Sequence, residues 1–355
     1  MRMKYKAVSF MDEIRQQPIV LREFIEQAFE ERELRRSLAE LMRDRQNPHI
    51  ILTGMGSSLF ACYITMKFLQ DHGFHASTIE SFELQSREEC FYTQETIVIA
   101  VSQSGESPEV LDLLDKLPAF VPVVSVTNYP NSHLHTMTKL ACGIYAGTEY
   151  LTSTKTYTNT LAAMMLLAYR LTGCGEEEME ALRSRLEKCA DRIECMISDK
   201  SLGHDVSEFI SDIEFLICIG SGYSYTTACH SEIVAEEAGK FYSSRFTAAQ
   251  FIHGPIELIR PGFGVLVYDF DRRYNAKCDE VRENVLQYGG KVLLITNRTD
   301  VVSRENQLVC HIGHEDSATA TLLEIIPLEL GIESLCNSRG VAAGQLSRVV
   351  KRIAS

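Results

Sequence analysis

The 355-residue sequence has no long hydrophobic run and no excess of positive charge. A helix that crosses a bilayer needs about 20 apolar residues. No run here approaches that length, so no membrane-spanning helix is expected. The N-terminal segment carries basic residues but no apolar core of the signal-peptide type, so no secretory signal peptide is expected in it. The net charge of −13 argues against nucleic acid or an anionic membrane as a partner.

Paired cysteine motifs are also missing. The eleven cysteines show no C-x-x-C pair and no regular spacing. An odd, irregular set is typical of a protein in a reducing compartment, so we expect a cytoplasmic protein. Cys189 and Cys195 are interpreted as packing residues rather than a redox pair. The length and the 45% hydrophobic content predict two globular domains.

The most informative segment is a strand-like run over 96–101 followed by a hydroxyl-rich turn, called here the serine turn (residues 102–107). Pro108 is typical of a first helical position, so a helix is expected to start there. The N–H groups and the dipole of a helix N-terminus favour a bound anion. No cation lies in the turn, so hydrogen bonds would hold a phosphate. Its donors are Ser102, Gln103, Ser104 and Ser107.

Strands and helices alternate through the first half, which predicts a parallel sheet covered on both faces. Strands are expected over 49–53, 76–81, 96–101, 121–128 and 142–145, and long helices over 59–69 and 155–171. A helical lead-in begins near Met11. Pro18 is expected to interrupt it, and helical periodicity resumes over 19–41.

The second half repeats the first. Gly54 and Gly220 open similar Gly/Ser turns 166 residues apart, and Asn128 and Asn297 close similar strands 169 residues apart. An internal duplication explains this nearly constant offset. A charged amphipathic helix over 176–197 joins the halves and puts the boundary near residue 198.

Five motifs in this order resemble tandem sugar-isomerase (SIS) domain proteins. They are Gly56-Ser57-Ser58, the serine turn, Thr127-Asn128, Ser153-Thr154-Lys155 and His253-Gly254-Pro255. The resemblance covers essentially the whole chain. It is strongest to the isomerase half of glucosamine-6-phosphate synthase (the glutamine–fructose-6-phosphate aminotransferase) and to the fructosamine and glucoselysine 6-phosphate deglycases. It implies an α/β fold of two flavodoxin-like SIS subdomains, each a parallel sheet flanked by helices.

The implied domains are a helical lead-in (1–30), a phosphosugar-binding SIS domain (31–197), a second SIS domain (198–340) and a tail (341–355). The phosphate is implied to lie on the serine turn, with Ser57 and Ser58 nearby and Ser153 close to the sugar. The resemblance also implies a homodimer in which His253 is donated by the neighbouring subunit.

Glu237 and His253 are the candidate catalytic residues. They stand sixteen residues apart, as in the family. There the glutamate moves a proton between sugar C1 and C2, and the histidine helps to open the ring. A buried carboxyl has a raised pKa and can act as base and then acid near neutral pH, where histidine also titrates. The alternatives are a solvated helix carboxylate beside Glu236 and a structural histidine.

One departure from the family bears on the reaction. Val234 occupies the position of the lysine that forms a Schiff base with the ketose in the synthase. The family's C-terminal lysine could correspond to Arg348 or to Lys351. A substrate that already carries an amine needs no such lysine, so the favoured activity is a deglycase for 6-phosphorylated sugar–amine conjugates. An aldose–ketose isomerase, an amino-sugar-6-phosphate deaminase or aminotransferase-like isomerase, and a non-enzymatic phosphosugar-sensing regulator remain alternatives.

No glutaminase domain is seen ahead of these motifs, so ammonia is not expected to come from glutamine by the synthase's route. Gly54-x-Gly56 and Gly220-x-Gly222 lack the third glycine of a dinucleotide fingerprint. The run 310–316 is rich in metal-ligand types but is interpreted as a solvated loop. No metal and no cofactor is therefore expected.

Overall fold

The computed structural model describes residues 8–314, 316–346, 348 and 351, which divide into two compact units. The N-terminal unit comprises residues 19–149 and 155–190. The C-terminal unit comprises residues 8–18 and 150–154 together with the described residues of 191–351. Each unit contains one five-stranded parallel sheet. The four domain ranges expected from the sequence stay predictions.

The sheet of the N-terminal unit has the strand order β2-β1-β3-β4-β5. Its central strands read as continuous apolar runs because helices cover both faces and leave almost every residue buried. On one face Ala100 packs against Val110 and Leu134. The strands are β1 (His49–Gly54), β2 (His75–Thr78), β3 (Thr96–Val101), β4 (Val123–Thr127) and β5 (Leu140–Gly143).

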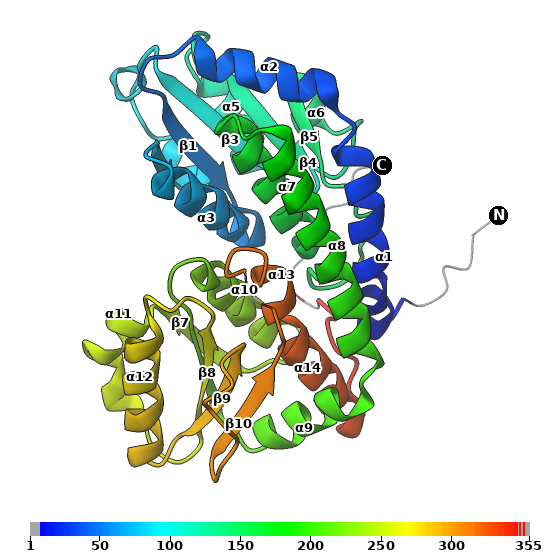
Figure 1. Cartoon of the computed structure of the whole chain (residues 1–355), viewed down its shortest axis with the longest axis vertical. Coiled ribbons are helices and arrows are strands. Elements are labelled where there is room, and N and C mark those ends of the chain that lie inside the picture. Colours follow the sequence, from blue (N-terminus) through cyan, green and yellow to red (C-terminus); the bar gives the residue numbers. More distant parts are fainter. Residues whose placement is uncertain (1–7, 315, 347, 349–350, 352–355) are drawn as a thin grey trace, which may run out of the picture. The chain divides into compact units, whose positions relative to one another are not determined.

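Two long helices of this unit, α3 (Gly56–Asp71) and α7 (Lys155–Leu171), lie side by side (Figure 1). Short elements pack on the sheet through residues such as Leu84 and Leu113. They are α4 (Ser81–Leu84), the 3-10 turn η1 (Glu89–Phe91), α5 (Pro108–Lys116) and α6 (His133–Met137). Helix α5 begins at Pro108, which confirms the predicted helix start.

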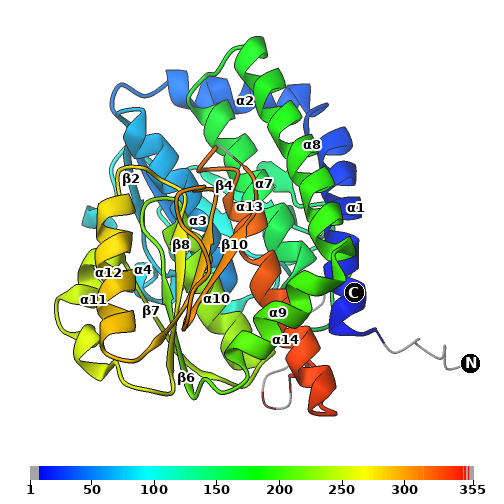
Figure 2. The ribbon, with the colours of Figure 1, turned by 60° about the horizontal axis from the view of Figure 1, so that its bottom comes forward.

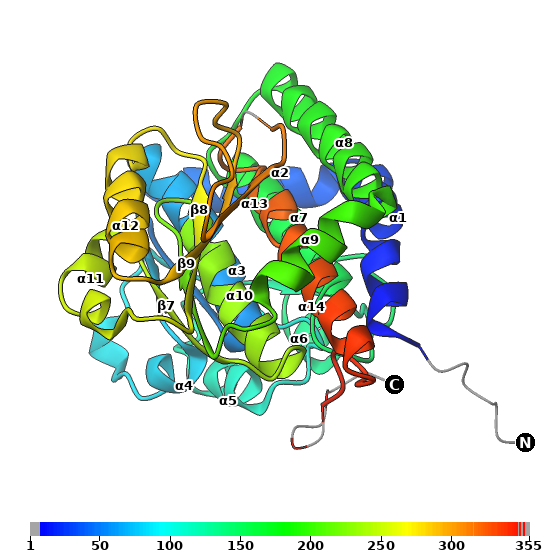
Figure 3. The ribbon, with the colours of Figure 1, turned by 90° about the horizontal axis from the view of Figure 1, so that it is seen from below.

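The sheet of the C-terminal unit has the order β10-β9-β8-β6-β7. Its strands are β6 (Phe215–Ile219), β7 (Tyr242–Phe246), β8 (Phe263–Asp269), β9 (Lys291–Thr296) and β10 (Gln307–His311). Figure 2 and Figure 3 show α11 (Ala248–Ile252) and α12 (Asn275–Gln287) on one side of this sheet. On the other side they show α9 (Lys200–Ile210), α10 (Ser224–Glu237) and α14 (Ile326–Ser338).

The two sheets have the same topology. Read from β7, the second sheet repeats the first strand for strand, since β6 and β8 occupy the central places of β1 and β3. This is the flavodoxin-like order 2-1-3-4-5. The duplication and the two-subdomain α/β fold predicted from the sequence are confirmed.

The prediction that Pro18 interrupts the lead-in helix is wrong. Helix α1 (Phe10–Ala28) runs through it. Proline removes one backbone hydrogen bond, but Ile14, Gln17 and Leu21 are fully buried on both sides of it, and their packing keeps the helix continuous. The predicted periodicity over 19–41 covers two helices, because α2 (Arg32–Arg43) is separate. Helix α8 (Glu176–Ser198) was predicted correctly.

No helix in the described part of the chain is both long enough and apolar enough to span a membrane. The remaining elements are the one-turn helix α13 (Thr321–Glu324) and the 3-10 turn η2 (Pro255–Leu258).

Buried Glu324 makes the stability of the C-terminal unit depend on pH. Burial raises the pKa of its carboxyl to about 7, and the hydrogen bond from Ser224 (2.6 Å) and the nearby Thr227 hydroxyl offset only part of this. The folded state therefore binds this proton more tightly than the unfolded state. The free energy of unfolding should fall as the pH rises from about 4.5 to about 7, by on the order of 3 kcal/mol.

We expect Glu324→Gln to remove this slope and to raise the melting temperature at pH 8 by several degrees relative to the wild type. Melting curves of both proteins between pH 4.5 and 8 would test this. Equal pH slopes for the two proteins would contradict it.

Candidate functional site

The serine turn is a compact set of buried hydroxyl and amide groups at the end of β3. The Ser102 N–H donates to the Val126 carbonyl (3.0 Å), and the Ser102 hydroxyl accepts from the Gly105 N–H (3.1 Å). The Ser104 hydroxyl accepts from the Glu106 N–H (3.2 Å). Ser102 and Ser104 are buried, while Gln103 and Ser107 are partly exposed. These groups are held in place before any ligand binds.

Ser107 occupies the N-cap position of α5, but its hydroxyl makes no bond to the helix. It lies 3.0 Å from the Ser102 hydroxyl instead. The Ser107 side chain therefore belongs to the serine turn. It does not cap the first N–H groups of α5. An oxygen-rich anion at this helix end would complete that hydrogen bonding.

Ser58 joins the serine turn to the turn that follows β1. Its hydroxyl accepts from the Gln103 N–H at 3.4 Å, and Ser57, next to it at the start of α3, is partly exposed. Strands β1 and β3 are neighbours whose chains continue to β2 and β4 on opposite sides, so their carboxyl ends meet at a topological switch point. Ligands of open α/β sheets bind at such points. The structure thus brings Ser57, Ser58 and the serine turn together.

Gly105 is required by the serine turn. Its φ is +68°, and an added Cβ would lie 2.1 Å from the Ser132 hydroxyl oxygen. Gly105→Ala should therefore destabilise the fold by about 3 kcal/mol, from left-handed strain and from displacement of Ser132. The melting temperature should fall by roughly 6–12 °C.

Gly73→Ala is the matched control for this substitution, since Gly73 has a φ of +82° with nothing within 4 Å of its added Cβ. It should show the backbone strain alone. Equal losses for the two variants, measured by thermal unfolding, would contradict the steric part of the prediction.

Glu237, the last residue of α10, is partly buried. Burial raises the pKa of its carboxyl, while the Thr152 hydroxyl and the ammonium groups of Lys351 and Lys240 pull it partly back. A carboxyl whose pKa is moved toward neutrality can both accept and return a proton. Val234, one turn earlier on α10, is fully buried.

The chain around Glu237 is fixed by backbone contacts. Lys240 Nζ donates to the Glu237 carbonyl (2.5 Å) and to the Gln345 carbonyl (2.9 Å). Lys351 Nζ donates to the Leu151 carbonyl (2.5 Å). The C-terminal segment thus passes Glu237, and Lys351 rather than exposed Arg348 faces it. Sequence reasoning missed Thr152, although it directly precedes the predicted residue Ser153.

Ser153 is partly exposed and belongs to the C-terminal unit, as Glu237 does. His253 directly follows α11, at its C-cap position, and is exposed. Its imidazole makes no hydrogen bond to any described residue, and none of the described contacts joins it to Glu237. Within this chain the structure therefore does not bring the two predicted catalytic residues into contact. The roles of all nine predicted site residues stay predictions.

Residues 45–170 match the family model described as the SIS domain, and the match includes β1, β3 and the whole serine turn. Residues 45–170 are a SIS domain. The chain is also 25% identical over 339 residues to the glutamine–fructose-6-phosphate aminotransferase (isomerizing) of Thermococcus kodakarensis. That alignment covers 93% of this chain and 55% of the relative. The chain spans about half the length of the curated relatives it matches.

Two solved structures share the fold of this SIS-domain chain. The C-terminal domain of glucosamine-fructose-6-phosphate aminotransferase from Francisella tularensis gives a TM-score of 0.85 at 20% identity, covering 98% of this chain and 100% of that one. Glucosamine-6-phosphate deaminase from Thermotoga maritima gives 0.74 at 16% identity, covering 98% and 99%. The predicted relation to SIS proteins and to the aminotransferase is confirmed.

The second sheet lacks a counterpart of the serine turn. The turn that follows β8 holds Asp271, whose two carboxylate oxygens accept from Arg273 Nε (3.0 Å) and Nη2 (2.6 Å). Arg298, after β9, is bound by Asp269, Asp279 and Asp300. The charged groups at this edge satisfy one another, whereas the serine turn offers neutral serine hydroxyls, and its one carboxylate, Glu106, bonds to His133.

Two further groups were checked as sites. Among the described residues, no cluster of His, Cys, Asp and Glu has the geometry to hold a metal ion. In the run 310–316, Cys310 is buried and the His314 imidazole bonds to Thr319 (2.7 Å), while Glu315 lies outside the described residues.

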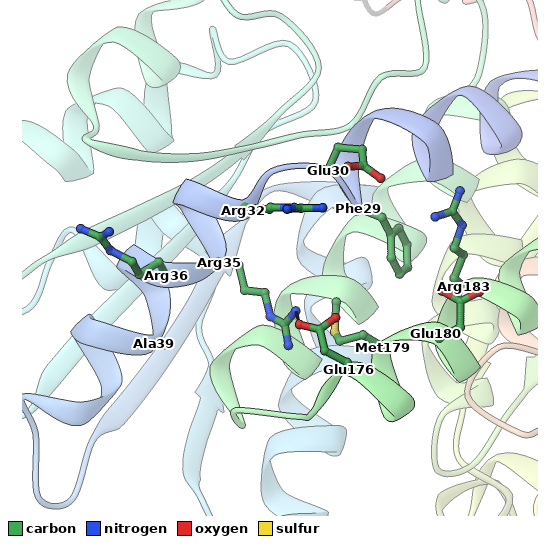
Figure 4. Close-up of a pocket in the computed structure, with 10 residues that line it drawn as sticks. All are labelled: Phe29, Glu30, Arg32, Arg35, Arg36, Ala39, Glu176, Met179, Glu180 and Arg183. Carbon is green, nitrogen blue, oxygen red and sulfur yellow. Dashed lines mark hydrogen bonds and ion pairs between the residues drawn. The ribbon is translucent and has the colours of Figure 1, made fainter.

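The other group is a hollow of about 620 Å³ between α2 and the start of α8 (Figure 4). Four arginines and three glutamates line it, and Arg35 is paired with Glu176 at 2.5 Å. Figure 4 shows Arg36 pointing away from the hollow. The charges that line this hollow largely cancel.

Proposed function

We propose that this chain is a deglycase that releases an amine or amino acid from a 6-phosphorylated sugar–amine conjugate. It shares the fold and family of sugar-phosphate enzymes. The serine turn, with Ser57 and Ser58, binds the phosphate through neutral hydroxyl and N–H donors. Such donors lose less affinity in salt than lysine or arginine, since there is no charge pair to screen.

The proposed reaction uses the amine that the substrate already carries. In a conjugate with the amine on C1 and a carbonyl on C2, Glu237 removes a proton from C1 while the C2 oxygen takes up a proton, which leaves an enaminol. The same carboxyl returns its proton to C2 while the nitrogen gives up its own proton, which gives an aldose with C1 doubly bonded to nitrogen. Water adds to C1, and the C1–N bond breaks to release the free amine and a 6-phosphorylated aldose. No redox change and no cofactor is needed.

The observation that carries this proposal is the pair Glu237 and Val234. The carboxyl of Glu237, which would move the proton, is half-buried, and burial raises its pKa. One turn away, Val234 stands fully buried at the position where the family resemblance implies a Schiff-base lysine. A site with the acid–base group but without that lysine suits a substrate that brings its own nitrogen.

His253 is proposed as the acid–base group that opens the sugar ring. Its exposed imidazole has no hydrogen bond to the described residues of its own chain, which suits a residue that completes the site of a second subunit. We therefore propose a homodimer that exchanges this segment. Mixing inactive Glu237→Gln and inactive His253→Ala chains should restore activity, because some sites then hold both residues.

Lys351 favours a second candidate function. Its ammonium lies close enough to Glu237 to lower the pKa of that carboxyl. A lysine there can form an imine with a ketose, as an aminotransferase-like isomerase or a deaminase would require. Its hydrogen bond to the Leu151 carbonyl favours a structural role instead.

The deciding experiment supplies fructoselysine 6-phosphate and glucoselysine 6-phosphate, and in parallel fructose 6-phosphate with ammonia, and measures free amine and sugar phosphate. Release of lysine that Glu237→Gln abolishes supports the deglycase. Turnover of the ammonia mixture alone, with Lys351 modified after borohydride reduction, supports the second candidate. Tight binding of sugar phosphates without turnover would indicate a sensing role.

A further inference from the structure

Glu13, on the first turn of α1, is a fully buried carboxylate. It accepts hydrogen bonds from two successive peptide groups, the Tyr150 N–H at 2.7 Å and the Leu151 N–H at 3.3 Å. Burying a carboxylate is costly unless such bonds compensate it. Charge-assisted bonds of this kind are about twice as strong as neutral ones. Glu13 therefore fixes the backbone of the loop at 150–151 across 137 residues of sequence.

The same loop continues directly into the surroundings of Glu237. The Leu151 carbonyl accepts from Lys351. The Thr152 N–H donates to the Gly344 carbonyl at 3.2 Å, and the Thr152 hydroxyl donates to the same carbonyl at 3.3 Å. The hydroxyl also lies close enough to the Glu237 carboxyl to lower the pKa of that group. Thr152 is 1% exposed, so it has little freedom to move independently of the loop. Ser153 follows it.

We infer that Glu13 is a positioning residue for the acid–base site: it holds the loop that presents Thr152 to Glu237 and Ser153 to the sugar. The hydrogen bonds described for the Glu13 carboxylate go to the Tyr150 and Leu151 N–H groups. The inference rests on the proposed function only for what Glu237 and Ser153 do. The hydrogen bonds that link Glu13 to Thr152 through the loop are independent of it.

Glu13→Gln keeps the size of the side chain but replaces one acceptor oxygen with an NH₂ group, which faces a peptide N–H. The loop should loosen, and the Thr152 hydroxyl should be lost to Glu237 for part of the time. Because that hydrogen bond lowers the pKa of Glu237, its loss should raise this pKa further. The acid limb of the profile of kcat/KM against pH should move upward by roughly half a unit.

Three variants make this test specific. Thr152→Val should shift the acid limb as Glu13→Gln does, and the double variant should shift it no further, because both act through one contact. Glu26→Gln, an exposed carboxylate on the same helix, should change nothing. The KM for substrate should stay within about threefold in Glu13→Gln, since the serine turn is untouched, whereas general unfolding would lower the active fraction at every pH.

A second readout separates this inference from the proposed activity. Carbon-13 NMR of glutamate carboxyls follows the titration of Glu237, and hydrogen exchange follows the Tyr150 and Leu151 amides, both without any substrate. Faster exchange and a raised Glu237 titration in Glu13→Gln support the positioning role even if no conjugate is turned over. An unchanged titration and unchanged exchange overturn it even if the wild type proves to be a deglycase.

Discussion

Glu237→Gln is expected to lower kcat for amine release at least 100-fold and to leave KM within about threefold. General acid–base groups contribute roughly 100- to 10,000-fold to a rate. Glutamine keeps the shape and can hydrogen-bond to Thr152, but it can neither take the C1 proton nor return one to C2. A loss confined to kcat marks a group used only in the transition state. Steady-state rates with a 6-phosphorylated conjugate would measure it.

The wild-type pH profile supplies the second half of this test. Glu237 must be ionised to act as the base, and burial raises the pKa of its carboxyl. Activity should therefore fall off on the acid side at a higher pH than an ordinary glutamate would give, and it should be retained toward neutral pH. The Glu237→Gln variant should show only its low residual rate, without this acid limb.

Glu236 is the matched control for Glu237, since it is the adjacent carboxylate on the same helix but is exposed. Glu236→Gln should retain most activity. It should move the acid limb slightly downward, because the Glu236 charge raises the pKa of Glu237. Equal losses from both substitutions would assign the effect to the helix rather than to the acid–base group and would contradict the mechanism.

Removing hydroxyls from the serine turn should weaken substrate binding strongly. A hydrogen bond to a charged group contributes about 1.5–3 kcal/mol, so Ser104→Ala should raise KM roughly 10- to 150-fold, and the Ser102→Ala, Ser104→Ala pair further. The chemical step should be affected much less, because the phosphate does not react. Titration calorimetry with a non-hydrolysed sugar phosphate would measure the affinity directly.

The control for this prediction is a ligand without the phosphate group. A conjugate without the phosphate should bind poorly to the wild type and equally poorly to Ser104→Ala, since the removed hydroxyl then has no partner. Affinity for the phosphorylated ligand should also change little between low and moderate salt, because the serine turn contains no cation. A steep salt dependence would instead indicate a lysine- or arginine-based phosphate site elsewhere.

Much of the fold follows from local sequence patterns. Parallel strands buried on both faces must be apolar throughout, so β1, β3 and β9 could be read directly, and the spacing of Gly54 and Gly220 identified the duplication. The predicted interruption at Pro18 was wrong because the burial of Ile14 and Leu21, which depends on non-local packing, outweighs one lost hydrogen bond. The start of α5 was predictable, whereas the orientation of the Ser107 hydroxyl was not, since it depends on Ser102 across the turn.

The candidate acid–base site shows the same division. Glu236 and Glu237 are adjacent carboxylates, and no property of the residues themselves says which one is half-buried. Only the family spacing to His253 singled out Glu237. Thr152 and Glu13 were missed because their contacts link residues more than 80 positions apart, and a threonine beside a serine loop carries no distinctive signal.

The C-terminal unit takes its chain from three places, residues 8–18, 150–154 and the described part of 191–351. Its hydrogen bond between Gly344 and Thr152 cannot form until Gly344 has been synthesised, 192 residues after Thr152. A fragment that begins at residue 198 would contain the whole second sheet but would lack Glu13 and Thr152, which belong to the same unit, so the duplicated halves are not separable modules. Co-expression of the two halves, rather than either alone, is the way to rebuild the protein from pieces.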